Sequence, residues 1–251
     1  MIDLTDKHIL IIGGSRGIGA ATAQMAAQAG ANVSINYLNR SEAAAAVVAN
    51  IEGRGKRAQA FQGDITQDGM AEQVVADSIA TLGEIDGLVI SAGIFEGATI
   101  DEMTPEFWDR TININLRSTY LSLRAAVPSL RRAGGGSIVI YTSTAGQRGS
   151  DVFSAYATSK GAQIMFMRSM AQELAPDKIR SNCVAPGWTE TEMATDMINE
   201  FGREDIVASI PLGRIGRPED PAAAAIFLLS DLAQFITGST ITVDGGFDMR
   251  G

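Results

Sequence analysis

The chain has almost none of the chemistry that histidine and cysteine provide, since it contains one His and one Cys in 251 residues. A lone Cys cannot form an internal disulfide, and the two residues together cannot supply the ligands of a zinc site. They also exclude a Ser-His or Cys-His catalytic pair unless His8 takes part. We expect no metal, a structural or solvated role for His8, and a buried packing role for Cys183 rather than a nucleophilic one.

Basic charge and long apolar runs are scarce as well. Lys plus Arg number 20 against 29 Asp plus Glu, which gives a formal charge of −9 and opposes general binding of nucleic acid. The longest purely apolar run, residues 222–229, is far shorter than the ~20 residues that span a bilayer. Residues 1–5 carry no secretory signal pattern. We therefore expect a cytoplasmic protein that binds neither nucleic acid nor membrane.

What the sequence does contain is a regular alternation of β-branched apolar runs with long Ala-rich segments. This alternation predicts an α/β protein with one doubly wound Rossmann fold, in which helices cover both faces of a seven-stranded parallel sheet. Strands are expected at residues 7–12, 32–37, 57–62, 86–91, 137–142, 179–185 and 239–243. Helices are expected at residues 18–29, 41–52, 68–82, 105–132, 153–174 and 218–229.

A glycine-rich turn joins the first strand to the first helix. Its sequence is Gly13-Gly14-Ser15-Arg16-Gly17-Ile18-Gly19, with the spacing G-x-x-x-G-x-G. Glycines let a backbone approach a pyrophosphate closely, and the helix N-terminus favours its negative charge. The turn therefore indicates a dinucleotide phosphate site, although a purely structural glycine turn explains the same residues equally well.

The residues at the end of the second strand indicate whether the predicted site binds NAD or NADP. Sites for NAD often place Asp or Glu there to bind the ribose, whereas sites for NADP need cations for the 2′-phosphate. No carboxylate follows this strand until Glu42, while Arg16 and Arg40 are available and Ser15 can donate a hydrogen bond. NADP(H) is therefore the expected cofactor, and the alternative is that both arginines are solvated surface charges.

Tyr156 and Lys160 are four residues apart in a predicted helix, so they share one face. An ammonium ~5 Å from a phenol contributes roughly 3 kcal/mol at an effective dielectric near 20, so we expect Lys160 to lower the Tyr156 pKa by about two units. Ser143 follows a strand at the edge where active sites of open α/β sheets gather. These residues predict a proton-transfer site, and the alternative is a core Tyr beside a Lys that extends to solvent.

At these residues the sequence resembles the short-chain dehydrogenase/reductase family, and the resemblance covers essentially the whole chain. The glycine turn of that family, T-G-x-x-x-G-x-G, is matched by Gly13, Gly17 and Gly19, with Ile12 in place of Thr. The family's Asp near the adenine corresponds to Asp64, which Ile65 follows. Its N-N-A-G segment appears as Ile90-Ser91-Ala92-Gly93, so both Asn side chains are missing.

The resemblance also implies a catalytic tetrad of Asn115, Ser143, Tyr156 and Lys160. Tyr156 would be the general acid/base and Ser143 would orient the substrate oxygen. Lys160 would bind the nicotinamide ribose, and Asn115 would support a proton-relay water, although Asn115 could instead cap or kink its helix. The implied cofactor-binding residues are Gly13, Ser15, Arg16, Gly17, Ile18, Gly19, Tyr37, Arg40, Asp64, Ile65, Ala92, Gly93, Tyr156, Lys160, Pro186, Gly187, Thr189 and Thr191.

No Pro- or Ser-rich linker divides the chain, so residues 1–251 are expected to form a single dinucleotide-binding and catalytic domain. Residues 188–212 leave the strand-helix pattern and are expected to be a substrate loop. Within them Trp188, Met193 and Met197 either line a hydrophobic substrate pocket or pack the loop down. The family resemblance implies a homotetramer.

The expected activity is NADP(H)-dependent hydride transfer to or from a ketone or secondary alcohol, with no metal. A close alternative is a 3-oxoacyl-acyl-carrier-protein reductase, for which Arg131 and Arg132 could dock the acidic carrier. Against it, Gln172 stands where that subgroup typically has Arg, and the whole chain is acidic. An alternative of another class is a nonenzymatic NADP-binding sensor, which the missing Asn pair favours and the intact Ser143, Tyr156 and Lys160 oppose.

Overall fold

The computed structural model describes residues 2–249. Seven parallel strands form one sheet in the order β3-β2-β1-β4-β5-β6-β7, so the chain reverses direction across the sheet between β1 and β4. This order confirms the predicted doubly wound fold. The strands are β1 (His8–Ile12), β2 (Asn32–Tyr37), β3 (Ala58–Gln62), β4 (Gly87–Ile90), β5 (Gly136–Tyr141), β6 (Ile179–Pro186) and β7 (Thr240–Val243).

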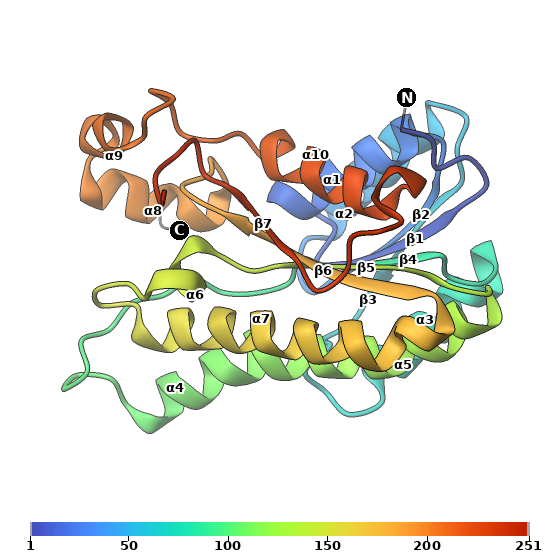
Figure 1. Cartoon of the computed structure of the whole chain (residues 1–251), viewed down its shortest axis with the longest axis horizontal. Coiled ribbons are helices and arrows are strands. Elements are labelled where there is room, and N and C mark those ends of the chain that lie inside the picture. The colour runs from blue at the N-terminus through green and yellow to red at the C-terminus, as the bar shows by residue number, and fades with distance from the viewer. Residues whose placement is uncertain (1, 250–251) are drawn as a thin grey trace.

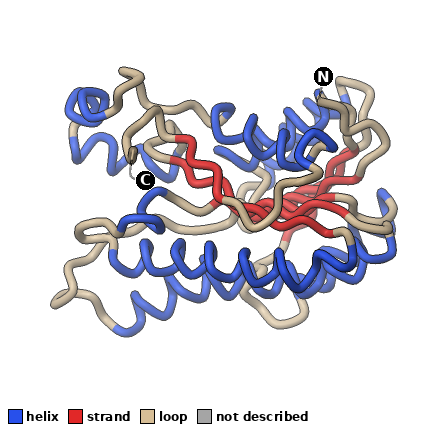
Figure 2. Tube along the Cα trace, viewed as in Figure 1, coloured by secondary structure: helices blue, strands red, loops and turns tan. Residues whose placement is uncertain are grey.

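Helices cover both faces of the sheet, as the continuous apolar strands predict (Figures 1 and 2). One face carries α1 (Gly17–Gln28), α2 (Ser41–Glu52) and α10 (Glu219–Leu229). The other face carries α3 (Met70–Leu82), α5 (Ser118–Arg132) and α7 (Ser154–Leu174). Two single-turn 3₁₀ helices, η2 (Ala175–Asp177) and η3 (Asp231–Ala233), complete the connections.

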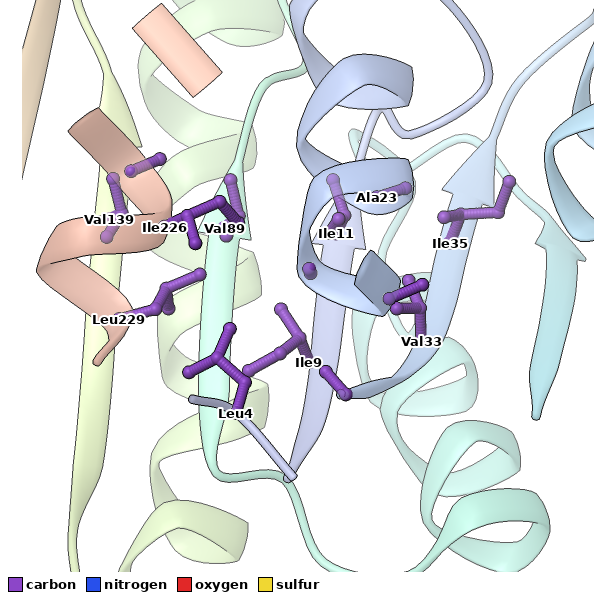
Figure 3. Packing of buried hydrophobic residues seen from close by; sticks show 14 of the residues in the cluster. Leu4, Ile9, Ile11, Ala23, Val33, Ile35, Val89, Val139, Ile226 and Leu229 are labelled. Atoms are coloured by element: carbon purple, nitrogen blue, oxygen red, sulfur yellow. The ribbon is translucent and has the colours of Figure 1, made fainter. Parts of the chain in front are cut away.

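Successive residues of β1, β4, β5 and β6 enter two separate cores. Ile9 and Ile11 of β1 pack toward α1 and α10 together with Leu229, and Figure 3 shows this packing. Leu10 and Ile12 point to the opposite face and its helices. Because side chains alternate along a strand, an unbroken apolar run is what a sheet covered on both faces requires.

The helix expected at residues 105–132 is interrupted, and this corrects the sequence prediction. It consists of α4 (Pro105–Ile112), a π-helical segment η1 (Asn113–Arg117) and α5. Thr104 caps α4 by accepting a hydrogen bond from the Phe107 amide at 3.2 Å. Single-turn π segments are frequent at functional sites, and this one carries Asn115.

Residues 188–212 are mostly helical and not a loop, which is a second correction. They contain α8 (Glu192–Phe201) and α9 (Arg203–Ser209), seen at the left of Figure 1. Ile198, Ile206 and Ile210 bury their side chains in a small third core, to which Trp188 is packed. The segment is therefore held by apolar packing of its own.

The remaining predicted elements agree with the structure to within two residues at each end. One short helix, α6 (Thr144–Arg148), directly follows β5 and was not expected. Among the described residues, no helix combines the length and apolar character that a membrane crossing requires.

Candidate active site

The glycine turn between β1 and α1 is a tight backbone cradle. The amides of Gly13 and Gly14 donate hydrogen bonds to the carbonyl of Asn36 at 3.1 and 3.0 Å. Gly13 has a φ of +81°, and a Cβ there would lie 2.6 Å from the Ala92 nitrogen. A Cβ on Gly19 would collide with the Gly13 carbonyl oxygen. Only glycine fits at these two positions without a shift of the backbone. The first amides of α1 have no partner within the helix, as at every helix N-terminus.

A cleft of about 700 Å³ opens above this turn at the carboxyl ends of the strands. Its volume lies within the ~300–1,000 Å³ typical of ligand sites. Most of the sequence-predicted site residues line it: Gly13, Ser15, Arg16, Gly17, Ile18, Tyr37, Arg40, Asp64, Ile65, Ala92, Gly93, Ser143, Tyr156, Lys160, Pro186, Gly187, Thr189 and Thr191. Gly19 and Asn115 lie behind its wall instead.

Two arginines contact one carboxylate at the end of the cleft formed by the glycine turn. Arg16 Nη1 lies 3.1 Å from Glu192 Oε2, and Arg40 Nη2 lies 3.4 Å from the same oxygen. Both guanidinium groups remain about half exposed. Arg16 and Arg40 therefore form a cationic pair that can receive an anion, as the sequence predicts, but Glu192 already contacts both of them.

Asp64 lines the same end of the cleft. Partial burial favours its protonated form, but hydrogen bonds from Thr66 and Gln67 outweigh that effect and hold the pKa of Asp64 below its usual value. The Thr66 amide and hydroxyl both donate to Asp64 Oδ1, at 3.0 and 2.7 Å. The carboxylate is thus ionised and fixed beside Ile65.

Ser143, Tyr156 and Lys160 come together in the wall of the cleft. Ser143 caps α6, where its Oγ accepts a hydrogen bond from the Ala145 amide at 3.1 Å, and it also hydrogen-bonds with Tyr156. Tyr156 lies in the first turn of α7, and Lys160 lies one turn later. Lys160 Nζ is 5.8 Å from the centre of the Tyr156 ring and donates to the Tyr141 carbonyl at 3.0 Å.

The expected lowering of the Tyr156 pKa by Lys160 is corrected by this geometry. Burial raises the pKa of Tyr156 to about 12, and the hydrogen bond with Ser143 only partly opposes this rise. Burial also lowers the pKa of Lys160 to about 8. The physical reason is that desolvation disfavours both charged forms, while the ammonium is directed at a backbone carbonyl. At neutral pH the site therefore holds a protonated phenol beside a lysine whose pKa is about 8.

Asn115 supports the site from behind rather than facing the cleft. Its Oδ1 accepts from the Ile94 amide at 2.8 Å, and its Nδ2 donates to the Ile94 carbonyl at 3.1 Å and to Ser159 Oγ at 3.0 Å. Its backbone carbonyl accepts hydrogen bonds from Gln163 Nε2 at 2.8 Å and from Thr119 Oγ1 at 2.8 Å. Asn115 thus fastens the π-helical segment to the loop after β4.

His8 and Cys183 lie inside the protein. His8 Nδ1 is 2.9 Å from the Gly83 carbonyl, and Nε2 is 2.5 Å from Ser34 Oγ. Burial lowers the pKa of His8, and burial raises the pKa of Cys183 to about 12. Cys183 packs in the core with Leu10 and Ile140. These contacts confirm structural roles for both residues.

Several residues that line the cleft were not predicted from the sequence. They include Phe95, Arg110, Arg148, Glu192 and Phe247. Phe95 follows the predicted Ala92-Gly93 pair by two residues, and Glu192 follows Thr191 directly, so proximity to known motifs was the available signal. Of the three loop residues considered, Trp188 and Met193 line the cleft, and Met197 is not part of its lining.

Known proteins similar to this chain include reductases and dehydrogenases. A family model described as enoyl-(acyl carrier protein) reductase matches residues 13–248. The chain is 39% identical over 245 residues to an L-rhamnose 1-dehydrogenase (NAD(P)(+)) of Sphingomonas sp. strain SKA58, covering 97% of this chain and 96% of that protein. It is 36% identical over 243 residues to a 3-oxoacyl-acyl-carrier-protein reductase of Chlamydia trachomatis, covering 97% and 98% of the two chains.

Solved structures agree with the sequence relatives. A short-chain type dehydrogenase/reductase from Mycobacterium ulcerans superposes with a TM-score of 0.92 at 33% identity, covering 98% of this chain and 91% of that chain. A short-chain dehydrogenase/reductase from Brucella melitensis, described as glucose/ribitol dehydrogenase, gives a TM-score of 0.92 at 35% identity and covers 99% of both chains.

Proposed function

The chain belongs to the short-chain dehydrogenase/reductase family, and we propose that it is an NADP(H)-dependent oxidoreductase that interconverts ketones and secondary alcohols. The observation that carries this proposal is the convergence of Ser143, Tyr156 and Lys160 in one wall of a cleft whose other end holds the glycine cradle and two arginines. A phosphate-binding end and a proton-transfer end in one cleft are what hydride transfer to a carbonyl requires.

The chemistry divides between cofactor and protein. A bound nicotinamide cofactor supplies or accepts the hydride at the carbonyl carbon. In reduction, Tyr156 Oη gives its proton to the carbonyl oxygen, so that hydride and proton together convert the ketone to the alcohol. The Ser143 hydroxyl donates a hydrogen bond to the same oxygen and fixes its position. The high pKa of the buried Tyr156 phenol keeps the donor protonated at neutral pH.

Lys160 assists the phenol electrostatically. As an ammonium 5.8 Å from the Tyr156 ring centre, it stabilises the phenolate that remains after proton donation. Lys160 Nζ also borders the backbone at Gly93, where a Cβ would lie 3.6 Å from it. The ammonium is therefore available to a cofactor ribose that would bind beside Gly93.

The cofactor fits the backbone of this cleft. Gly13 and Gly19 have no side chain, so the turn can pack tightly against Ala92 and against itself. The backbone of this turn and of the first turn of α1 would hold the pyrophosphate. Pro186, Gly187, Thr189 and Thr191 also line the cleft and would hold the nicotinamide. Preference for NADP(H) is supported by Arg16 and Arg40, which can pair with a 2′-phosphate.

A second candidate is reduction of 3-oxoacyl groups on an acyl carrier, which the similarity to such a reductase of Chlamydia trachomatis supports. The proposed docking arginines argue against it. Arg131 is paired with Asp177 at 2.7 Å, and Arg132 is paired with Glu84 at 2.8 Å. Paired charges attract an acidic carrier less strongly than free ones, so we favour general ketone reduction.

We propose further that the enzyme is a cytoplasmic homotetramer of single-domain protomers. Large apolar side chains are exposed on the outer surfaces of α5 and α7, at Tyr120 and Met165, and near the C-terminus, at Leu232 and Phe235. Exposed apolar groups on several faces are typical of surfaces that become buried in an oligomer. Light scattering of the purified protein tests this proposal.

The test of the proposed function is a panel of ketones, secondary alcohols and a 3-oxobutanoyl thioester, each run with NADH and NADPH or their oxidised forms. We expect turnover of ketones with NADPH preferred. Faster turnover of the thioester than of every ketone would favour the second candidate. Tight NADPH binding without turnover on any compound would contradict both and favour a sensor.

A further inference from the structure

We infer, on the basis of the proposed function, that the substrate is an uncharged ketone with an aromatic substituent. The observation is a cluster of five aromatic side chains that includes the proposed proton donor, Tyr156, and that we call the aromatic wall. Its members come from the loop after β4, from the start of α7, from the segment after β6 and from the end of α8: Phe95, Phe153, Tyr156, Trp188 and Phe201.

Phe95 is the centre of the aromatic wall. Its ring centroid lies 4.6 Å from that of Phe153 in a stacked arrangement and 4.8 Å from that of Tyr156 in a tilted one. Trp188 is 6.3 Å away at 75°, an edge-to-face contact. These separations are in the range that aromatic pairs prefer. Phe95 and Trp188 both line the cleft, so a substrate held at Tyr156 contacts these rings.

The aromatic wall is fixed by the backbone around it. The Ala98 amide donates to the Val152 carbonyl at 2.8 Å, which joins the Phe95 loop to the segment before α7. A Cβ on Gly97 would lie 2.9 Å from Phe153 Cε1, so this loop packs directly against that ring. Phe153 is buried, whereas Phe201 is 47% exposed and lies 5.9 Å from Trp188. The aromatic wall therefore runs from the buried Phe153 to the half-exposed Phe201.

The charges near the aromatic wall do not favour an anionic substrate. Arg110 Nη1 donates to Glu96 Oε1 at 3.1 Å. Arg148 Nε is 3.8 Å from Asp248, and its guanidinium lies 4.8 Å from the centre of the Phe247 ring. Both arginines line the cleft, and each is already matched by a carboxylate. A negatively charged substrate would have to displace one of these pairs.

A polyol is also poorly matched to this surface. The aromatic rings of the wall cannot replace the hydrogen bonds that sugar hydroxyls make with water. Hydroxyls left without a hydrogen-bond partner make sugar binding unfavourable. An aryl group loses no hydrogen bonds and gains edge and face contacts with Phe95 and Trp188. The same surface that disfavours a sugar therefore selects an aryl ketone.

The test compares acetophenone with butanone in the NADPH-dependent direction and 1-phenylethanol with L-rhamnose in the oxidising direction. We expect kcat/KM for acetophenone to exceed that for butanone by about 100-fold, since discrimination by apolar contacts is typically of that size. We expect 1-phenylethanol to be oxidised faster than L-rhamnose by a similar factor.

Variants locate the preference in the aromatic wall. Phe95→Ala should lower the ratio of kcat/KM for acetophenone to kcat/KM for butanone about tenfold. Phe201→Ala should lower this ratio by a smaller factor. Phe201 is half exposed, so its truncation spares the core and the second variant remains informative if the first is poorly folded. Trp108→Ala removes a partly exposed ring of α4 that does not line the cleft and is the matched control, which should leave the ratio unchanged.

The outcomes separate this inference from the proposed function. Equal kcat/KM for acetophenone and butanone, or faster oxidation of L-rhamnose, would overturn the aryl preference and leave the reductase activity standing. An unchanged ratio in both wall variants would overturn the assignment to the aromatic wall. Absence of turnover with all four compounds and both cofactors would overturn the proposed function together with the inference.

Discussion

The carboxylate of Glu192 accepts a hydrogen bond from Arg16 Nη1 at 3.1 Å, which joins the first residue of α8 to the glycine turn. The same oxygen lies 3.4 Å from Arg40. One acidic side chain thus bridges the two cations proposed to bind the 2′-phosphate. An incoming phosphate and Glu192 then compete for the same guanidinium groups.

Removing this carboxylate charge should tighten NADPH binding. Glu192→Gln is expected to lower the Kd for NADPH about three- to fivefold, the effect of one exposed ion pair, and to change the Kd for NADH little. Isothermal titration with both cofactors measures this difference. Glu200→Gln, at an exposed residue of the same helix, is the control. An equal decrease in the Kd values for NADH and NADPH would show that Glu192 does not compete with the 2′-phosphate.

The rate of ketone reduction should fall above pH 8. Burial lowers the pKa of Lys160 to about 8, so its ammonium is present below this pH and is lost above it. The Tyr156 phenol, with its raised pKa, stays protonated throughout. We therefore expect kcat/KM for reduction to be level below pH 8 and to decrease above it. A profile that remains level to pH 10 would contradict the role given to Lys160.

The same buried lysine should destabilise the folded protein at neutral pH. Because the folded pKa lies below the unfolded value, the unfolded chain binds more protons between pH 8 and 10.5, and the free energy of unfolding rises across that window. Lys160→Met should therefore increase the free energy of unfolding at pH 7 by up to about 3 kcal/mol, and this gain should vanish above pH 10.5.

Urea unfolding at pH 7 and at pH 10.5 checks this pH dependence. Lys56→Met is the matched control, at a lysine that lies outside the buried core. Its effect on the free energy of unfolding should be the same at pH 7 and at pH 10.5. A Lys160→Met variant that is less stable than the native protein at pH 7 would mean that the hydrogen bond to the Tyr141 carbonyl outweighs the desolvation of the ammonium.

The sheet could be predicted from the sequence because its determinants are local. Ile9 to Ile12 are apolar at every position, and this pattern is unambiguous for a strand covered on both faces. The interruption at Asn115 could not be predicted in the same way. Its carbonyl is held by Gln163, 48 residues later in the chain, so the π-helical segment depends on tertiary contacts.

In the candidate site, too, the features set by local sequence could be predicted, and those set by tertiary packing could not. Tyr156 and Lys160 share a helix, and their spacing alone brings them together. The direction of the Tyr156 pKa shift depends on burial, which the spacing does not reveal, and here the sequence prediction was wrong. Phe95 and Glu192 lie within two residues of predicted site residues, but whether their side chains face the cleft depends on the packing of segments far apart in the chain. Their sequence positions alone therefore did not identify them.

The central claim is that Tyr156 donates the proton to the substrate oxygen, and replacing it by Phe tests this most directly. Tyr156→Phe keeps the ring in the aromatic wall and removes only the hydroxyl. NADPH consumption with a ketone that the native enzyme reduces should fall about 1,000-fold, while the Kd for NADPH should stay close to the native value. Turnover near that of the native enzyme in the Tyr156→Phe variant would contradict the account.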